Sequence, residues 1–173
     1  MAYSADDVKR LREVTAAGML DCKKALDEAG GDFDKAVEIL RISGAAKAAK
    51  RGAEREASTG VVAHEEGVLV ELLCETDFVA KNEEFGVFAN TVSQVSIDKK
   101  PATIEDYKAL PYNNDITIGD KFIEQIGKIG EKIDLSYYQS VEAAYVVAYN
   151  HPGNKIACIV GFNKPVSEEV AKN

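Results

Sequence analysis

The chain has 173 residues, 46% of them hydrophobic, and a formal net charge of -8 at pH 7. This length and apolar content suffice for one or two compact domains with their own cores, which excludes a disordered tail. The acidic excess argues against a protein whose main task is to hold phosphate backbones, because that task needs a net basic face. We therefore expect no direct nucleic-acid partner.

The cysteines and the apolar runs bear on the cellular compartment. Cys22, Cys74 and Cys158 lie far apart, and three cysteines do not make a disulfide framework. The N-terminus lacks the cationic and apolar segments of a signal peptide. No apolar run approaches the roughly 20 residues needed to cross a bilayer. These features predict a cytoplasmic protein with no membrane partner.

The N-terminal part, residues 1–44, has the pattern of three short helices. The first has a candidate N-cap at Ser4, the second begins at Met19, and the third is predicted to end at Gly44. The sequence then changes to Ala, Lys, Arg and Glu without an apolar stripe over residues 45–58, which predicts a solvated helical linker. Its basic residues leave open a contact with an acidic partner, although a spacer between two domains is the favoured interpretation.

From residue 59 the apolar pattern changes to that of strands. Residues 61–64 and 68–74 flank Glu65-Glu66-Gly67, which predicts a β-hairpin with Gly67 at the positive-φ position of its turn. A helix is predicted from Asn82, because apolar residues recur there at spacings of three and four. Residues 102–118 are ambiguous, with a short helix over 104–110 as one interpretation.

The last part of the chain predicts another helix and a second hairpin. The helix covers residues 122–129, strands follow at 132–138, 143–149 and 156–162, and the turn between the last two is His151-Pro152-Gly153-Asn154. We therefore predict an α+β fold with antiparallel pairing and two related core parts, residues 59–137 and 138–173. Residues 167–173 have the pattern of a helix N-terminus, so we expect the natural chain to continue.

Motifs for nucleotide, metal and nucleophilic chemistry are weak or absent. The chain contains neither GxxxxGK[ST] nor GxGxxG, so we expect it to bind no nucleotide and no cofactor. Its two histidines and three scattered cysteines do not predict a metal site. A nucleophilic pair of Cys74 with His64 across the first hairpin is geometrically possible, although a free cysteine is most often a small buried hydrophobe.

Two stretches resemble the signature regions of a known family. They are LREVTAAGMLDCKKAL, residues 11–26, and ELLCETDFVAK, residues 71–81, and they resemble bacterial elongation factor Ts in sequence, order and separation. The segment YNHPGNKI, residues 149–156, resembles a hairpin turn of the same family. Two positions depart from the family pattern: Ala16 stands where glycine is usual, and Leu20 replaces a frequent methionine.

The resemblance implies a fold and a function. The fold would be an N-terminal three-helix bundle like that of ubiquitin-associated domains, then a linker and a core of α+β subdomains. The function would be guanine-nucleotide exchange on elongation factor Tu bound to GDP, with no catalytic residue or metal of its own. In the family, the segment matching Thr76, Asp77, Phe78 and Val79 is pushed against the GTPase and is associated with dislodging Mg²⁺, and its Phe enters between helices beside the switch region. The partner would be bound in both its GDP-bound and nucleotide-free states.

The same resemblance assigns partner contacts to Arg12, Met19, Leu20 and His151. Two of these residues have an equally good structural interpretation, since Met19 could pack in the bundle core and His151 could serve only as a turn residue. An alternative function is a non-catalytic adaptor whose three-helix domain binds a ubiquitin-like or nascent-chain partner. That alternative leaves the Thr76–Val79 segment unexplained.

Overall fold

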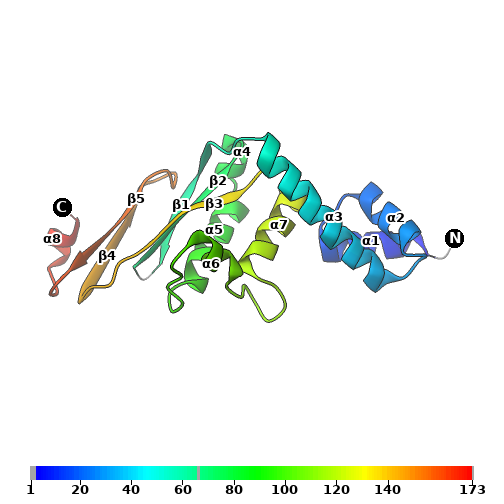
Figure 1. Cartoon of the computed structure of the whole chain (residues 1–173). Helices are drawn as coiled ribbons and strands as arrows, with labels where there is room; N and C mark the ends of the chain where they lie inside the picture. Colours follow the sequence, from blue (N-terminus) through cyan, green and yellow to red (C-terminus); the bar gives the residue numbers. More distant parts are fainter. Residues whose placement is uncertain (1–2, 66, 173) are drawn as a thin grey trace. The chain divides into compact units, whose positions relative to one another are not determined.

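The computed structural model describes residues 3–65 and 67–172. Its internal contacts divide the chain into two compact units (Figure 1). The first unit comprises Met1–Glu56 with Phe122–Lys132, and the second comprises Ala57–Lys121 with Ile133–Asn173. Mixed helices and antiparallel strands confirm the predicted α+β class, whereas the likeness of the first three helices to a ubiquitin-associated domain stays a prediction.

Three helices form the core of the first unit: α1 (Ala5–Thr15), α2 (Met19–Glu28) and α3 (Phe33–Glu54). The predicted N-cap is confirmed, because Ser4 Oγ accepts a hydrogen bond from the Asp7 amide while the Asp7 carboxylate accepts one from the Ser4 amide. The helices bury one apolar cluster, made of Val8, Leu11, Cys22, Ala25, Leu26, Ala36 and Leu40.

The predicted end of the third helix at Gly44 is wrong, because α3 continues to Glu54. A single glycine inside a helix costs only about 1 kcal/mol relative to alanine. The residues that follow it are mostly Ala, Lys, Arg and Glu, which are among the strongest helix formers. The segment over residues 45–54 is helical, as predicted, but it is part of α3 rather than a separate linker element.

The C-terminal end of α3 is held by a segment distant in sequence. Helix α7 (Ile118–Ile129) ends shortly before Lys132, whose Nζ donates hydrogen bonds to the carbonyl oxygens of Gly52, at 3.0 Å, and Arg55, at 3.1 Å. Carbonyl groups at a helix C-terminus lack partners within the helix, and a lysine satisfies them. Residues 122–132 belong to the first unit, which the sequence did not predict, and this contact is one of those that join them to α3.

A three-stranded antiparallel sheet organises the second unit. Its strands are β1 (Thr59–Glu65), β2 (Val68–Cys74) and β3 (Asp134–Ser140), in the order β1-β2-β3. The predicted first hairpin is confirmed, with Gly67 at φ 85°. Side chains of β2 alternate between buried and half-buried, so one face of the sheet lies on the core. Because β3 continues to Ser140, the boundary drawn between residues 137 and 138 lies inside this strand.

Helices cover the buried face of that sheet. After the one-turn helix α4 (Asp77–Ala80), α5 (Glu83–Val95) packs against β1 and β2 through Phe85, Phe88 and Val92. The short helix α6 (Ile104–Ala109) confirms one interpretation of an ambiguous stretch. Its buried Tyr107 hydroxyl donates toward the Val92 carbonyl at 2.7 Å and lies 2.8 Å from Ser96 Oγ, which attaches α6 to the end of α5.

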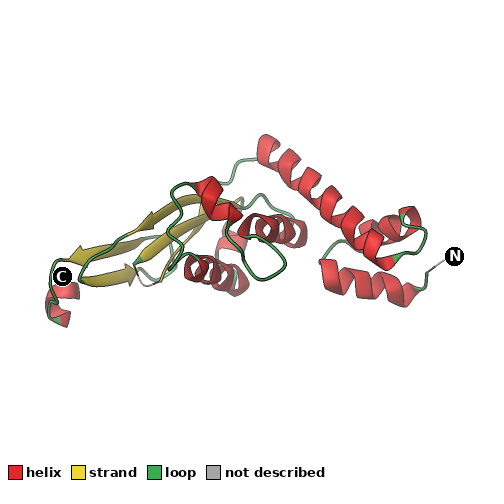
Figure 2. Cartoon of the chain, turned by 60° about the horizontal axis from the view of Figure 1, so that its bottom comes forward, coloured by secondary structure: helices red, strands yellow, loops and turns green. Residues whose placement is uncertain are grey.

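The second hairpin is also confirmed and forms its own two-stranded sheet. Strand β4 (Tyr145–Asn150) pairs antiparallel with β5 (Ala157–Phe162), and the short helix α8 (Glu168–Lys172) follows β5 (Figure 2). The turn of this hairpin lies on the free edge of β1, where the Val62 amide donates to the Asn154 carbonyl at 2.8 Å. This contact covers the edge of β1 at Val62, where an exposed edge would be open to pairing with another chain.

We predict that Ala16→Gly raises the free energy of unfolding by about 1 kcal/mol, because Ala16 ends α1 in the left-handed conformation, with φ 54°, where Cβ is strained. The effect is measured by urea denaturation. Ala17→Gly is the matched control, since the adjacent Ala17 does not have a positive φ and packs against the apolar cluster. That control should lower stability, and a lowered stability for Ala16→Gly would contradict the prediction.

Candidate functional site

The segment between β2 and α5 folds as a single helical turn that presents one apolar side chain to solvent. Thr76 is its N-cap, with extended backbone and an Oγ1 that accepts a hydrogen bond from the Val79 amide. Asn82 caps the next helix only a few residues later, so α4 ends after one turn. Ala80 is buried beneath this turn, whereas Phe78 is 91% exposed. We call residues Thr76–Val79 the Phe78 loop.

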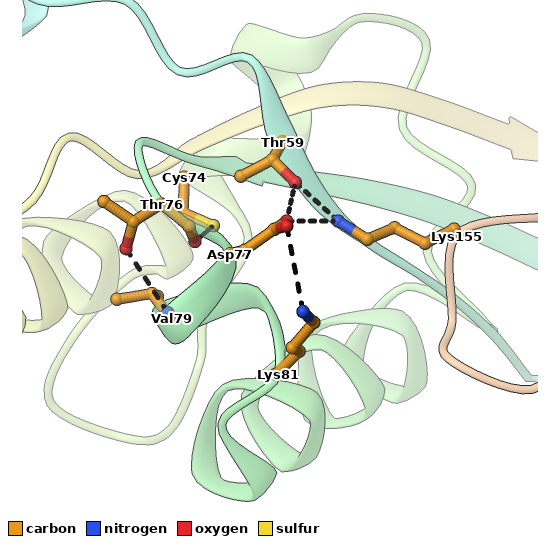
Figure 3. A network of polar contacts seen from close by, with 7 residues as sticks. All are labelled: Thr59, Cys74, Thr76, Asp77, Val79, Lys81 and Lys155. Atoms are coloured by element: carbon orange, nitrogen blue, oxygen red, sulfur yellow. Dashed lines mark hydrogen bonds and ion pairs between the residues drawn. The ribbon is translucent and has the colours of Figure 1, made fainter.

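Asp77 ties the Phe78 loop to two distant parts of the second unit (Figure 3). Its Oδ1 accepts a hydrogen bond from Thr59 Oγ1 at 2.9 Å, at the start of β1, and one from Lys155 Nζ at 3.1 Å, beyond the turn of the second hairpin. Lys81, on the next turn of the chain, lies 3.8 Å from Oδ2. The carboxylate therefore joins the loop, the sheet and the second hairpin.

The hydrogen bond from Lys155 is the largest cause that lowers the pKa of Asp77 below its ordinary value. The hydrogen bond from Thr59 is the next cause, followed by the positive charges of Lys155 and Lys81. Each of these contacts favours the ionised carboxylate. Asp77 is therefore charged at neutral pH, and the network persists there.

The turn of the second hairpin has a fixed backbone geometry. The His151 amide donates to the Ile156 carbonyl and the Asn154 amide donates to the His151 carbonyl, at 2.8 and 2.9 Å. Gly153 and Asn154 both have positive φ, 93° and 54°. The His151 side chain is exposed, with Nδ1 2.8 Å from the Tyr149 hydroxyl. This turn places His151 on the surface and Lys155 toward Asp77.

The other predicted partner contacts lie in the first unit, around the turn between α1 and α2. Arg12 is exposed near the end of α1, and Met19 and Leu20 begin α2 with exposures of 46% and 75%. Met19 is therefore not in the bundle core. Val14, which recurs at helical spacing with Val8 and Leu11, is 61% exposed. Val14, Met19 and Leu20 leave an apolar surface at this turn, which we call the α1–α2 surface.

Comparison with known proteins agrees with the earlier resemblance. A family model described as Elongation factor TS matches residues 75–173. The chain belongs to the elongation factor Ts family. It is 44% identical to the elongation factor Ts of Porphyromonas gingivalis over all of this chain and 64% of that relative. It is 45% identical to that of Christiangramia forsetii over 98% of this chain and 64% of the relative, and 44% identical to that of Bacteroides thetaiotaomicron over 99% and 53%.

The chain thus spans about two thirds or less of the length of these elongation factor Ts relatives. Membership in this family does not favour the adaptor alternative. Within residues 3–65 and 67–172, no helix is long and apolar enough to cross a membrane. Over the same residues, no group of three or more His, Cys, Asp or Glu side chains is arranged to hold a metal ion.

The nucleophilic pair of Cys74 with His64 is wrong. In the hairpin Cys74 faces Thr59, whereas His64 faces Leu69, five residues away along β2 and so roughly 16 Å distant. An odd number of residues also puts the two side chains on opposite faces of the sheet. Cys74 is fully buried, and its thiol lies 3.4 Å from the Thr76 carbonyl, so it supports the start of the Phe78 loop.

Sequence reasoning found the Phe78 loop and the His151 turn but missed the residues that connect them. Thr59 is an ordinary polar residue at a strand start, and Lys155 is one of many surface lysines. The only available signal was the presence of Lys155 within the YNHPGNKI segment that resembles the family. Their meeting at Asp77 depends on how the second hairpin packs on β1, which no local pattern specifies.

We predict that Lys155→Met moves the pKa of Asp77 upward toward the ordinary carboxyl value, because the largest cause of the depression is removed. Since the folded pKa is depressed, the stabilising contribution of ionised Asp77 is present above the unfolded pKa of about 3.9 and is lost as pH falls through the folded pKa. The NMR shift of the Asp77 carboxyl carbon against pH measures this. Lys164→Met, an exposed lysine elsewhere in the second unit, is the control, and an equal shift in both variants would contradict the prediction.

Proposed function

We propose that this chain is a guanine-nucleotide exchange factor that binds elongation factor Tu carrying GDP and promotes GDP release and exchange for GTP during translation elongation. Membership in the elongation factor Ts family supports the class of function. The observation that carries the proposal to particular residues is the 91% exposure of Phe78 on a loop held by charged contacts. A Phe side chain so presented is available for burial in a pocket of another molecule, which would yield roughly 1.5–3 kcal/mol.

In this proposal the Phe78 loop enters the GTPase and displaces the bound Mg²⁺. Mg²⁺ requires near-ideal octahedral geometry and neutralises charge on the phosphates of the nucleotide, so a small displacement of its supports weakens GDP binding. Phe78 is the inserted side chain. Thr76 and Val79 close the helical turn through their hydrogen bond, and Asp77 anchors the turn.

The energetics are adequate for such a step. Burying a Phe side chain yields roughly 1.5–3 kcal/mol, and each factor of ten in affinity corresponds to about 1.4 kcal/mol. Insertion of Phe78 alone could therefore offset about a tenfold to hundredfold loss of nucleotide affinity. The coupling is reciprocal, so GDP weakens binding of the factor by the same ratio.

The first unit supplies binding energy in this proposal. The α1–α2 surface offers Val14, Met19 and Leu20 as apolar contacts, and the exposed Arg12 beside it can donate hydrogen bonds to carbonyls or carboxylates. His151 adds a contact from the second unit. We also infer that α1, α2 and the first part of α3 form the ubiquitin-associated-like bundle of the family.

The proposal needs no covalent chemistry, catalytic residue or cofactor in this chain, because the nucleotide and its Mg²⁺ belong to the partner. It also requires the compartment in which translation takes place, the cytoplasm. The net charge of -8 fits a protein partner better than a nucleic acid.

We predict that Phe78→Ala slows factor-stimulated GDP release at least tenfold, since burial of the ring supplies the energy of displacement. The assay is stopped-flow release of a fluorescent GDP from elongation factor Tu across Mg²⁺ concentrations, where stimulation by the parent chain should fade as Mg²⁺ rises. Val87→Ala, which truncates another exposed apolar residue of the second unit, is the matched control and should not change the rate. An unaltered release rate for Phe78→Ala would remove this residue from the mechanism.

We predict that Leu20→Ser weakens binding to elongation factor Tu by roughly tenfold without changing the maximal rate of GDP release, because it removes apolar contact that exists both before and during exchange. Titration calorimetry gives the dissociation constant, and the stopped-flow rate at a saturating concentration of the factor gives the maximal rate of GDP release. Ile42→Ser, which alters an exposed apolar residue on α3, is the control. Equal affinities for Leu20→Ser and the parent would show that the α1–α2 surface does not contact elongation factor Tu at Leu20.

A further inference from the structure

We propose that Lys155 is a positioning residue that fixes the orientation of the Phe78 loop from the second hairpin. This inference rests on the proposed function for its consequence, but its geometric part stands on the second unit alone. Lys155 and Asp77 are separated by 78 residues in sequence, and their side chains meet at 3.1 Å. A long-range contact at the residue next to Phe78 is well placed to hold that side chain.

The restraints within the loop do not by themselves orient it relative to the sheet. The hydrogen bond from Val79 to Thr76 is long, at 3.5 Å, and the backbone bonds of α4 join residues of the same turn. Such bonds give the turn its shape and move with it. Anchorage to the body of the unit includes the buried Cys74 thiol near the Thr76 carbonyl, the packing of buried Ala80, and the Asp77 carboxylate, which lies on the residue next to Phe78.

Lys155 differs from Lys81, the other lysine near Asp77. Lys81 follows α4 directly, is 74% exposed in its side chain, and donates its backbone amide to the Asp77 carbonyl, so it moves with the loop. Lys155 comes from a separate element and its side chain is 44% exposed. It also donates a hydrogen bond to Thr59 Oγ1, which itself donates to Asp77. The three side chains therefore form a closed triangle between β1, the loop and the second hairpin.

The second hairpin is itself fixed to the sheet, which makes it a firm support for Lys155. The Val62 amide donates to the Asn154 carbonyl at 2.8 Å, and the Asn150 side-chain amide donates to the Val62 carbonyl at 3.2 Å. These bonds satisfy both outward backbone groups of one residue on the edge of β1. The residue before Lys155 is thus held directly by the sheet, and the lysine side chain extends from a defined point.

Because Lys155 follows the turn that carries His151, the arrangement links two proposed partner contacts. When a partner binds at His151, Phe78 would already have a defined orientation relative to it. Preorganisation of this kind benefits the displacement step, which needs the ring in one place, more than it benefits initial binding. Loss of the Lys155 contact should therefore lower the maximal rate of exchange. The half-saturating concentration of the factor should change little.

The geometric part is tested on the chain alone with a fluorescent reporter. The sequence contains no tryptophan, so Phe78→Trp places a single indole at the loop, and its time-resolved anisotropy reports local motion. Adding Lys155→Met to this reporter should increase the amplitude of the fast component. Lys155→Arg should restore the parent decay, Lys81→Met should have a smaller effect, and the distant Lys164→Met should have none. An unchanged decay with Lys155→Met would overturn the proposal.

The functional part uses the stopped-flow assay with Phe78 intact. Lys155→Met should lower the maximal rate of GDP release by roughly three- to fivefold, the effect expected when a partly exposed ion pair is lost. In an Asp77→Asn background the same substitution should have no further effect, because Lys155 acts through the carboxylate. Full additivity of the two substitutions, or a change confined to the half-saturating concentration, would overturn the positioning role.

The outcomes separate this inference from the proposed function. If the parent chain does not accelerate GDP release while the anisotropy responds to Lys155→Met, the exchange proposal fails for this chain and the positioning of the loop stands. If the parent accelerates release but neither the anisotropy nor the rate responds, the positioning role fails alone. Urea denaturation of each variant checks that the second unit remains folded.

Discussion

The docking of the second hairpin on the edge of β1 is the interaction on which the candidate site depends. Both outward backbone groups of Val62 are satisfied by residues that flank the hairpin turn, so an exposed strand edge becomes an internal junction. That junction fixes the start of the segment from which Lys155 reaches Asp77. Without it the Phe78 loop would keep its helical turn, through Thr76 and Asn82, and its hydrogen bond from Thr59, but would lose the contact from Lys155.

Local patterns in the sequence predicted much of the second unit, because its elements are specified by nearby residues. Two apolar runs that flank Glu65-Glu66-Gly67 predicted the hairpin of β1 and β2, and Gly67 supplied its positive φ. Phe78 lies on the connection between an apolar strand and a helix whose own apolar face begins at Phe85, and such connections lie on the surface. Each of these features is decided within about one turn or one strand, which is the range over which periodicity is informative.

The failures arose where distant segments decide the outcome. Gly44 ends no helix because strong helix formers follow it and because a segment around Lys132 holds the far end of α3. Val14 falls at helical spacing from Leu11, yet α2 and α3 do not cover it, and it stays exposed. The meeting of Thr59, Asp77 and Lys155 joins residues up to 96 positions apart. Neither composition nor spacing predicts which surface lysine will pair with which carboxylate.

The anchor of the Phe78 loop is made of contacts that are individually weak, and this suits the proposed task. Asp77 and Lys155 are both partly exposed, with side-chain exposures of 61% and 44%, so their attraction is screened by water and by salt. A buried, stronger anchor would hold the loop equally well but would resist any adjustment as Phe78 enters a partner. A contact network of three side chains instead keeps the ring in one region before binding and yields at small cost when the fit requires it. The geometry thus orients the Phe78 side chain before binding and still allows the loop to adjust when it contacts the partner.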